Sequence, residues 1–521
     1  MNYNYSHGDY IVCEPDIDCA KCKAMHPWPK GILLECGEGT GSRTFTASND
    51  APFQLAHVTV DTACLNKSEV LIKFSSLVSM EVLVNTGTVR LQYELFRACD
   101  GREPICLGTW MYENVNVFDR VFENIEESFS FIFCECLNCQ RCCDYFVTVT
   151  PIDIVNATAT VNNGRIAALS QSLCNSLNKH EAGESKNRNT KFKQNHPIPK
   201  KILLECGKGS GGITFNDTTD PAATIAYVTI DTTCLSKSKI LIDFSSMIYF
   251  SFGTDSLSLK FELLRVCNDG QPASLGTWIY ELSRGASGVQ NIDVNEAFSF
   301  IFCDSLTCSG SCKYIVMASV IDARQTDSNN LVLVYNGRIS ALAQPLIDCH
   351  SYDTHENCGE ISHYANCNSK CPEPKKILLE CGSGNISKTF TSESQQTPFQ
   401  LAHVTIDTAR LSKPVVNIEF SSNVSFESIS GNRNGTLRYE LFRVCGDDKT
   451  LKSLGVWSIG RRFTTNIDKA TKTFNFTFCD NINCLGCCEY FVSVTPIGIS
   501  GLSITVDNGR IAALAQSSNV E

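Results

Sequence analysis

The sequence predicts an all-β protein made of three tandem β-sandwich domains, jelly-roll-like in topology and joined by polar, cysteine-containing linkers. The first observation is an internal repeat whose period is far too long for a solenoid. The openings of its copies are Gly31–Gly37, Lys201–Gly207 and Lys376–Gly382, and the closing motifs are Asn163–Ile166, Asn336–Ile339 and Asn508–Ile511. The second observation is that apolar and polar residues alternate along many short runs, and no comparable run has helical periodicity.

About nine strands are expected in the first copy, separated by Gly, Asn, Asp and Pro signals. They cover roughly residues 32–36, 43–47, 53–62, 70–83, 88–99, 106–114, 128–136, 144–154 and 157–172. In the fifth run, Val89, Leu91 and Tyr93 alternate with Arg90 and Gln92, which is typical of a half-buried strand. The dipeptide Asn163-Gly164 near the end is of the type that forms hairpin turns.

The repeat divides the chain into six segments. They are an N-terminal cysteine-containing extension (1–29), sandwich unit one (30–172), a linker (173–199), unit two (200–345), a cysteine-rich linker (346–374) and unit three (375–521). Alternating prolines precede each unit, as in His26-Pro-Trp-Pro-Lys30, and favour an extended entry into the domain. We therefore expect three separate domains arranged like beads on a string.

Composition and charge restrict which partners the chain can bind and in which cellular compartment it resides. The formal net charge is −11 and the basic residues are scattered, which argues against nucleic acid. No apolar run approaches about 18 residues, so no membrane span is expected, and Met1–Tyr10 has no features of a secretory signal. The 29 cysteines nevertheless suit an oxidising destination. A spore surface or an extracellular location, reached after release from the cell, would explain both the missing secretory signal and the high cysteine content.

The cysteines at repeated positions are expected to form disulfides within the units, because each unit holds several of them. These candidates are Cys36, Cys64, Cys99, Cys134, Cys139, Cys143, Cys206, Cys234, Cys267, Cys303, Cys308, Cys312, Cys381, Cys445, Cys479, Cys484, Cys487 and Cys488. A bridge from Cys134 to Cys143 across their loop is one candidate, although six cysteines allow 15 pairings. Alternation along its strand places Cys134 on the face opposite Phe129, Phe131 and Phe133, so it points away from the main core.

A second set of cysteines lies in the extension and the second linker, and is expected to cross-link domains or molecules. This set is Cys13, Cys19, Cys22, Cys349, Cys358, Cys367 and Cys371. Local bridges within these segments are the alternative. An odd number of cysteines in 1–29 favours intermolecular pairing there.

Neither a metal site nor a catalytic site is expected. Cysteine pairs such as Cys139 and Cys142 have zinc-ligand spacing, but unit two replaces the second cysteine with Ser311. The glycine-rich run Gly207–Gly212 lacks the ending of a phosphate-binding loop, so no cofactor is expected.

Two further sets of residues could have either a chemical role or a purely structural role. Glu94 and Arg97, with their counterparts Glu262 with Arg265 and Glu440 with Arg443, are predicted to be structural. Trp110, Trp278 and Trp457 are predicted to pack in the cores, with a sugar-stacking platform as the alternative.

The chain resembles a family of uncharacterised cysteine-rich proteins of spore-forming clostridia, defined as a domain of unknown function. The resemblance rests on Ile-Leu-Leu-Glu-Cys-Gly, Phe53–Thr59, Tyr93–Arg97 and Asn163–Ala168, and covers most of each sandwich. It implies no established activity and no catalytic residues. In organisation alone, the chain is also similar to endospore appendage subunits, which are jelly-roll proteins with a cysteine-bearing N-terminal connector.

These observations predict that the chain is not an enzyme but a structural, self-associating protein of a spore surface or extracellular fibre. Disulfides through the extensions would join copies of the chain or other surface proteins. A multivalent adhesin or carbohydrate-binding array is the first alternative, and a thiolate metal-binding protein is the second.

Overall fold

The computed structural model describes residues 30–172, 201–345 and 376–517, apart from short gaps within the units. The gaps are residues 63–64, 66–67, 84–85, 118–123, 138–141, 234, 236, 252–253, 269, 284–292, 307–309, 326–330, 385–386, 393–396, 430–432, 446–449, 464–468 and 483–485. The described residues form strands and turns and no helix, so the all-β prediction is confirmed. No described segment is a helix that could cross a membrane.

The strands follow the same order in each unit. Unit one contains β1 (Leu33–Cys36), β2 (Glu38–Gly39), β3 (Arg43–Phe45), β4 (Phe53–Asp61), β5 (Ser68–Val82), β6 (Thr86–Cys99), β7 (Ile105–Val117), β8 (Asn124–Leu137), β9 (Cys142–Val155) and β10 (Ala157–Ser172). Unit two contains β11 (Leu203–Cys206), β12 (Lys208–Gly209), β13 (Ile213–Phe215), β14 (Ala223–Asp231), β15 (Ser238–Ser251), β16 (Thr254–Cys267), β17 (Ala273–Ser283), β18 (Asp293–Leu306), β19 (Ser311–Gln325) and β20 (Leu331–Pro345). Unit three contains β21 (Leu378–Ser383), β22 (Lys388–Phe390), β23 (Phe399–Asp407), β24 (Pro414–Ser428), β25 (Arg433–Cys445), β26 (Lys452–Phe463), β27 (Lys469–Asn481), β28 (Cys487–Ser500) and β29 (Leu502–Ser517).

Each unit is a sandwich of two antiparallel sheets. In unit one the order β1-β10-β5-β8 forms the sheet that we call the inner sheet, and β2-β4-β9-β6-β7 forms the outer sheet. All nine strands expected from the alternation are present, and the two-residue strand β2 was not anticipated. The hairpin expected at Asn163-Gly164 is wrong, because β10 runs through it with a bulge between Asn162 and Arg165. Gly164 is required there, since a Cβ atom would lie 2.7 Å from the backbone oxygen of Leu55.

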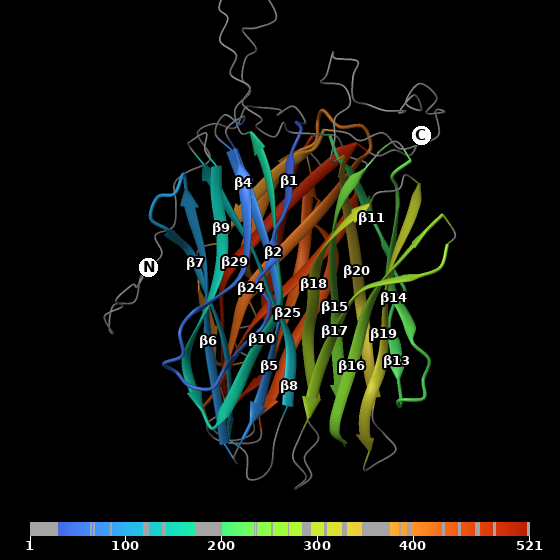
Figure 1. Ribbon diagram of the computed structural model, residues 1–521. Coiled ribbons are helices and arrows are strands. Elements are labelled where there is room, and N and C mark those ends of the chain that lie inside the picture. Colours follow the sequence, from blue (N-terminus) through green and yellow to red (C-terminus); the bar gives the residue numbers. More distant parts are fainter. Residues whose placement is uncertain are drawn as a thin grey trace, which may run out of the picture.

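The expectation of separate beads is also wrong, because the three units close into a ring. Strand β8 of unit one pairs with β17 of unit two, β18 of unit two pairs with β26 of unit three, and β27 of unit three pairs with β7 of unit one. Each continuous sheet thus joins the inner sheet of one unit to the outer sheet of the next. Figure 1 shows the long strands of all units packed side by side in one body.

The physical reason for the ring lies in the inner sheets, which are buried on both faces. In β5, the eleven residues from Ser68 to Val78 are all buried, a pattern that one sandwich core cannot produce because it covers only alternate residues. One face packs in the core of its own unit. The other face meets the inner sheets of the other two units in a fourth, shared core. This axial core is formed by Ile32, Leu34, Leu71, Ile132, Ala167, Leu169, Ile202, Leu204, Leu241, Ile301, Leu342, Ile377, Leu379, Ala512 and Leu514.

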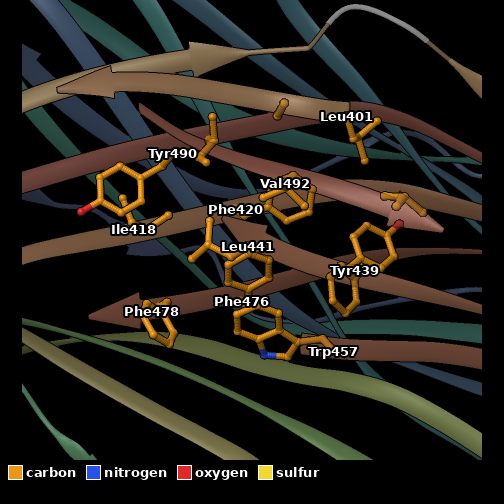
Figure 2. Packing of buried hydrophobic residues seen from close by; sticks show 14 of the residues in the cluster. Leu401, Ile418, Phe420, Tyr439, Leu441, Trp457, Phe476, Phe478, Tyr490 and Val492 are labelled. Carbon is orange, nitrogen blue, oxygen red and sulfur yellow. The ribbon is translucent and has the colours of Figure 1, made fainter. Parts of the chain in front are cut away.

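The repeated tryptophans lie in the three separate cores. Trp110, Trp278 and Trp457 stack on phenylalanines of the inner sheets, with ring centroids 3.7, 3.7 and 3.9 Å apart. Figure 2 shows Trp457 against Phe476 among the buried side chains of unit three. Each tryptophan is at most 4% exposed, so none can serve as a sugar-stacking platform.

Candidate functional site: the polar axis between the units

The motifs that recur three times in the sequence build the contacts between units. Cys36 in the opening motif is bonded to Cys303 of unit two, Cys206 to Cys479 of unit three, and Cys381 to Cys134 of unit one. The Cα–Cα distances are 6.1, 5.9 and 6.0 Å, and each bridge joins the opening motif of one unit to the equivalent inner-sheet strand of the next unit. These six cysteines were expected to pair within units, and that prediction is wrong.

The proposed bridge from Cys134 to Cys143 is wrong for the same reason. Cys134 does point away from the core of its own unit, but the side to which it points is the axis, where Cys381 lies. Cys143 instead pairs with Cys99, which is its direct neighbour across β6 and β9. Cys267–Cys312 and Cys445–Cys488 repeat this pairing within units two and three. Because Cys134 and Cys143 are in disulfides, neither supplies a thiolate to a metal site.

The remaining cysteines fall into three groups. Cys142 and Cys487 are exposed and free, so the expected disulfide of Cys487 is absent. Cys106 and Cys136, which occur only in unit one, are also disulfide-bonded. The candidates outside the described residues are Cys13, Cys19, Cys22, Cys64, Cys139, Cys234, Cys308, Cys349, Cys358, Cys367, Cys371 and Cys484.

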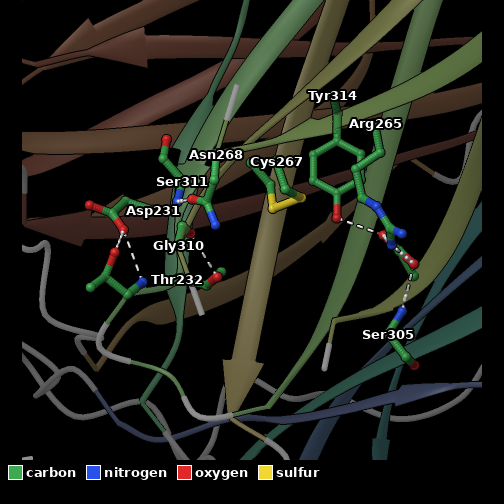
Figure 3. Close-up of a disulfide and its surroundings, with 12 residues drawn as sticks. Asp231, Thr232, Arg265, Cys267, Asn268, Ser305, Gly310, Ser311 and Tyr314 are labelled. Atoms are coloured by element: carbon green, nitrogen blue, oxygen red, sulfur yellow. Dashed lines mark hydrogen bonds and ion pairs between the residues drawn. A yellow bond between two sulfur atoms is a disulfide. The ribbon is translucent and has the colours of Figure 1, made fainter. Parts of the chain in front are cut away.

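Near each disulfide between units lies a carboxylate that holds an arginine. Figure 3 shows Arg265 and Tyr314 of unit two beside the disulfide within that unit, Cys267–Cys312. The Arg265 guanidinium and the Tyr314 hydroxyl both contact Asp304, which follows Cys303 in sequence, at 2.7 Å each. Arg97 and Tyr145 bind Glu135 in the same way in unit one. The arginine partner is therefore a residue of the inner sheet, and Glu94, which is close in sequence, is not its partner. Burial raises the pKa of Glu94.

A ring of three glutamines closes one end of the axis. The side-chain amide of Gln171 donates to the oxygen of Ile377 and accepts from the backbone N–H of Leu379, at 2.8 and 3.0 Å. Gln344 makes the same pair of bonds with Ile32 and Leu34, and Gln516 with Ile202 and Leu204. Each glutamine satisfies two buried backbone groups of the neighbouring unit, as a paired strand would.

The arginine of each closing motif also crosses to the next unit. Arg165 lies over the ring of Phe302, Arg338 over Phe478, and Arg510 over Phe133, with distances to the ring centroids of 5.3, 4.8 and 5.1 Å. Burial lowers the pKa of Arg338 and Arg510. Cation–π contacts of this kind stabilise the three interfaces in the same way.

Two clusters of charged residues lie where the three units meet. We call the first the Lys472 triad: Lys472 contacts Glu127 of unit one at 2.8 Å and also Glu296 of unit two. The three residues occupy the same position of strands β27, β8 and β18. Tyr280 donates to Glu296 at 2.7 Å. Burial raises the pKa of Glu127, whereas Lys472 and Arg461 outweigh burial at Glu296 and lower its pKa.

The second cluster is the Lys73 triad, formed by Lys73, Asp243 and Glu419 at the same position of β5, β15 and β24. The Lys73 ammonium lies 2.9 Å from Asp243 and also contacts Glu419. Lys73 and Glu419 are 1% and 3% exposed. Beside them lies a cavity of about 30 Å³, lined also by Ser130, Ser299 and Asn475. Burial, opposed by Lys73, raises the pKa of Glu419 to about 7.

Besides the two triads, a pair of glutamates lies where β8 meets β17, and it makes stability depend on pH. Burial, with the facing Glu281, raises the pKa of Glu126 to about 7. The folded-state pKa is above the unfolded value, so this stabilising term is complete below about pH 4.5 and is lost as pH rises through about 7. Glu126→Gln should remove about 1–2 kcal/mol of the difference in unfolding free energy between pH 5 and pH 7.5, allowing for solvent screening.

Denaturant unfolding of both proteins at the two pH values measures this effect. Glu103→Gln, a change at an exposed residue, is the control and should leave the pH dependence as it is. If Glu126→Gln and the unchanged protein lose the same stability between pH 5 and pH 7.5, Glu126 is not the responsible group.

Comparison with known proteins identifies the family to which the three units belong. A family model described as "Domain of unknown function (DUF4489)" matches residues 30–171, 200–344 and 375–516. No curated protein matches the chain. Two solved structures share 11% sequence identity with it, at TM-scores too low to support an argument.

The first of these structures is the N-terminal CBM22-1-CBM22-2 tandem domain of Xyn10C from Paenibacillus barcinonensis, with a TM-score of 0.17, covering 60% of this chain and 98% of that one. The second is the PBSX exported protein XepA, with a TM-score of 0.10, covering 61% of this chain and 89% of that one. The family match spans most of the chain and coincides with the three sandwiches. The chain therefore belongs to the DUF4489 family, a family of domains of unknown function, and carries three copies of its domain.

Proposed function

We propose that the chain is a structural, self-associating protein of a spore surface or extracellular fibre. In this proposal the ring is a covalently closed head, and the cysteines of the extension and linkers join it to other copies. The disulfides between units support an oxidising environment for the head. The observation that carries the proposal is the position of the chain ends around the glutamine ring.

The six ends of the described units lie together at one end of the axis. Gln171, Gln344 and Gln516 each precede the last described residue of their unit, and each binds the first strand of a neighbouring unit. Lys30, the first described residue, donates to the oxygen of Ser172 and pairs with Ile377. Segments 1–29, 173–200 and 346–375 therefore all attach to the same end of the head.

This arrangement supports a building block with two different ends, only one of which carries the connectors. Eight cysteines belong to the three segments: Cys13, Cys19, Cys22, Cys174, Cys349, Cys358, Cys367 and Cys371. Attachment at one end brings the starting points of the three connectors of one molecule together. Cross-linking between molecules through these cysteines is what the proposal requires, and the odd number of cysteines in 1–29 supports it.

The test replaces Cys13, Cys19 and Cys22 with serine in the full chain. We expect the unchanged protein to form reductant-sensitive oligomers on non-reducing electrophoresis and extended assemblies by electron microscopy, and the triple variant to lose at least most of both. Cys142→Ser with Cys487→Ser is the matched control, since these thiols are exposed on the head. Monomers in all proteins, or equal oligomers in the triple variant, would contradict the proposed role of the extension.

A further inference from the structure

We propose that Lys73 and Asp243 condense to an isopeptide bond, which joins unit one to unit two, with Glu419 of unit three carrying the proton. The bond would be a second covalent lock across the axis, chemically distinct from the disulfides. It is independent of the proposed function, since it concerns the head alone.

The geometry brings the three reacting groups together from three strands. The Lys73 Nζ atom lies 2.9 Å from Oδ2 of Asp243, and it also donates to Oε1 of Glu419. Asn417 donates to the same Glu419 oxygen at 2.9 Å, which fixes that carboxyl group. Holding an amine and a carboxyl group in contact replaces a bimolecular reaction with an intramolecular one, which accelerates amide formation by orders of magnitude.

The surroundings favour condensation over hydrolysis. Phe74, Phe131, Phe300, Phe420 and Phe476 line the cavity beside the triad, together with hydroxyl and amide groups. Lys73 is 1% exposed, so bulk water does not reach the nitrogen. The cavity of about 30 Å³ is large enough to hold the one water molecule that the reaction releases. The Oε2 atom of Glu419 is buried and has no hydrogen-bond partner among the described residues.

The reaction balances without an oxidant or a cofactor. Glu419 accepts one ammonium proton from Lys73, and the neutral Nζ attacks Cγ of Asp243. The Nζ–Cγ bond forms and one Cγ–O bond breaks. Of the three ammonium protons, one stays on the amide nitrogen and two leave with the oxygen as water, one of them carried by Glu419. Glu419 then returns to its starting state, as a general acid–base group should.

The Lys472 triad differs from the Lys73 triad in its charge balance, and this difference predicts which of the two triads forms an isopeptide bond. There Lys472 and Arg461 face Glu127 and Glu296, so two positive charges balance two negative ones. In the Lys73 triad one ammonium faces two carboxylates, so while Asp243 reacts the Glu419 carboxylate can accept the ammonium proton. Arg461 favours the charged form of both Glu127 and Glu296, which makes these carboxylates poorer acceptors of the Lys472 proton. We therefore expect the chain to lose one water molecule and not two.

The test is the intact mass of the full-length protein after complete reduction of its disulfides. We expect a mass one water molecule below that of the sequence, and a proteolytic fragment in which the peptides of Lys73 and Asp243 are joined. If a protease site is inserted in linker 173–199, cleaved, reduced and denatured protein should keep units one and two as one species on electrophoresis.

Glu419→Gln is the informative variant, since it keeps the shape of the side chain and both reacting groups. It should show the full sequence mass while retaining the circular dichroism of a β protein. Lys469→Met, at a residue 39% exposed, is the control and should still lose one water molecule. A full sequence mass for the unchanged protein, or a water loss that maps to residues other than Lys73 and Asp243, would overturn the proposal.

Discussion

Replacing Lys472 with methionine should destabilise the folded chain by about 3–5 kcal/mol. Lys472 is 8% exposed and is the partner of both Glu127 and Glu296, which are equally buried. Methionine fills the space but leaves two carboxyl groups facing each other with only Arg461 to offset them. Breaking a buried ion cluster from one side costs more than the cluster contributes, because the remaining charges stay desolvated. The midpoint of guanidinium unfolding measures the effect.

The same strand supplies the control for this prediction. Lys469 lies three residues earlier, is 39% exposed and approaches Glu113 at 3.5 Å. Lys469→Met should therefore change the unfolding free energy by less than about 1 kcal/mol. Adding Glu127→Gln and Glu296→Gln to Lys472→Met should restore part of the loss. Equal effects of Lys472→Met and Lys469→Met would show that the Lys472 triad is not a buried cluster.

Removing the disulfides between units is expected to have the second large effect. Paired serine replacements of Cys36 with Cys303, Cys206 with Cys479, and Cys134 with Cys381 each remove one link of the ring. Each should cost about 2–4 kcal/mol, because the unfolded chain regains freedom between distant segments. The three effects should not add fully, because the bridges connect the same units and the strand pairing remains.

Cys142→Ser and Cys487→Ser serve as controls for the disulfide variants. Both cysteines are exposed and free, so their replacement should stay within about 0.5 kcal/mol. Thermal unfolding followed by circular dichroism compares all variants. Unfolding midpoints for the paired variants that match those of the controls would mean that the inter-unit bridges do not constrain the chain.

The sequence was sufficient for the strands and insufficient for the assembly. Alternation in Val89–Leu95 and in Phe129–Phe133 follows directly from burial of one face in a sandwich core, and it located these strands correctly. The run from Ser68 to Val78 predicts a strand, but its burial on both faces is seen only in the structure. That burial shows that a second partner covers the sheet.

The position of the axial site also left a signal in the sequence. Lys73, Asp243 and Glu419 occupy one position of the repeat, as do Glu127, Glu296 and Lys472. A repeat position that holds both charge signs in different copies indicates that the copies meet there, because identical charges around an axis would repel one another. Three identical units could not form either triad.

The cysteine pairing could not be deduced by considering one unit alone. Cys134 was placed correctly on the face away from its own core, but the residue that meets it, Cys381, lies 247 residues later. Only the threefold arrangement of the units brings the two together. The pairs within units, such as Cys99 and Cys143, depend instead on the register of adjacent strands β6 and β9.

The most direct test of the closed ring is peptide mapping of the intact disulfides by mass spectrometry without reduction. The account predicts three linked peptide pairs that each join two different units: Cys36 with Cys303, Cys206 with Cys479, and Cys134 with Cys381. Pairs confined to single units, such as Cys134 with Cys143, or free thiols at these six positions would contradict it.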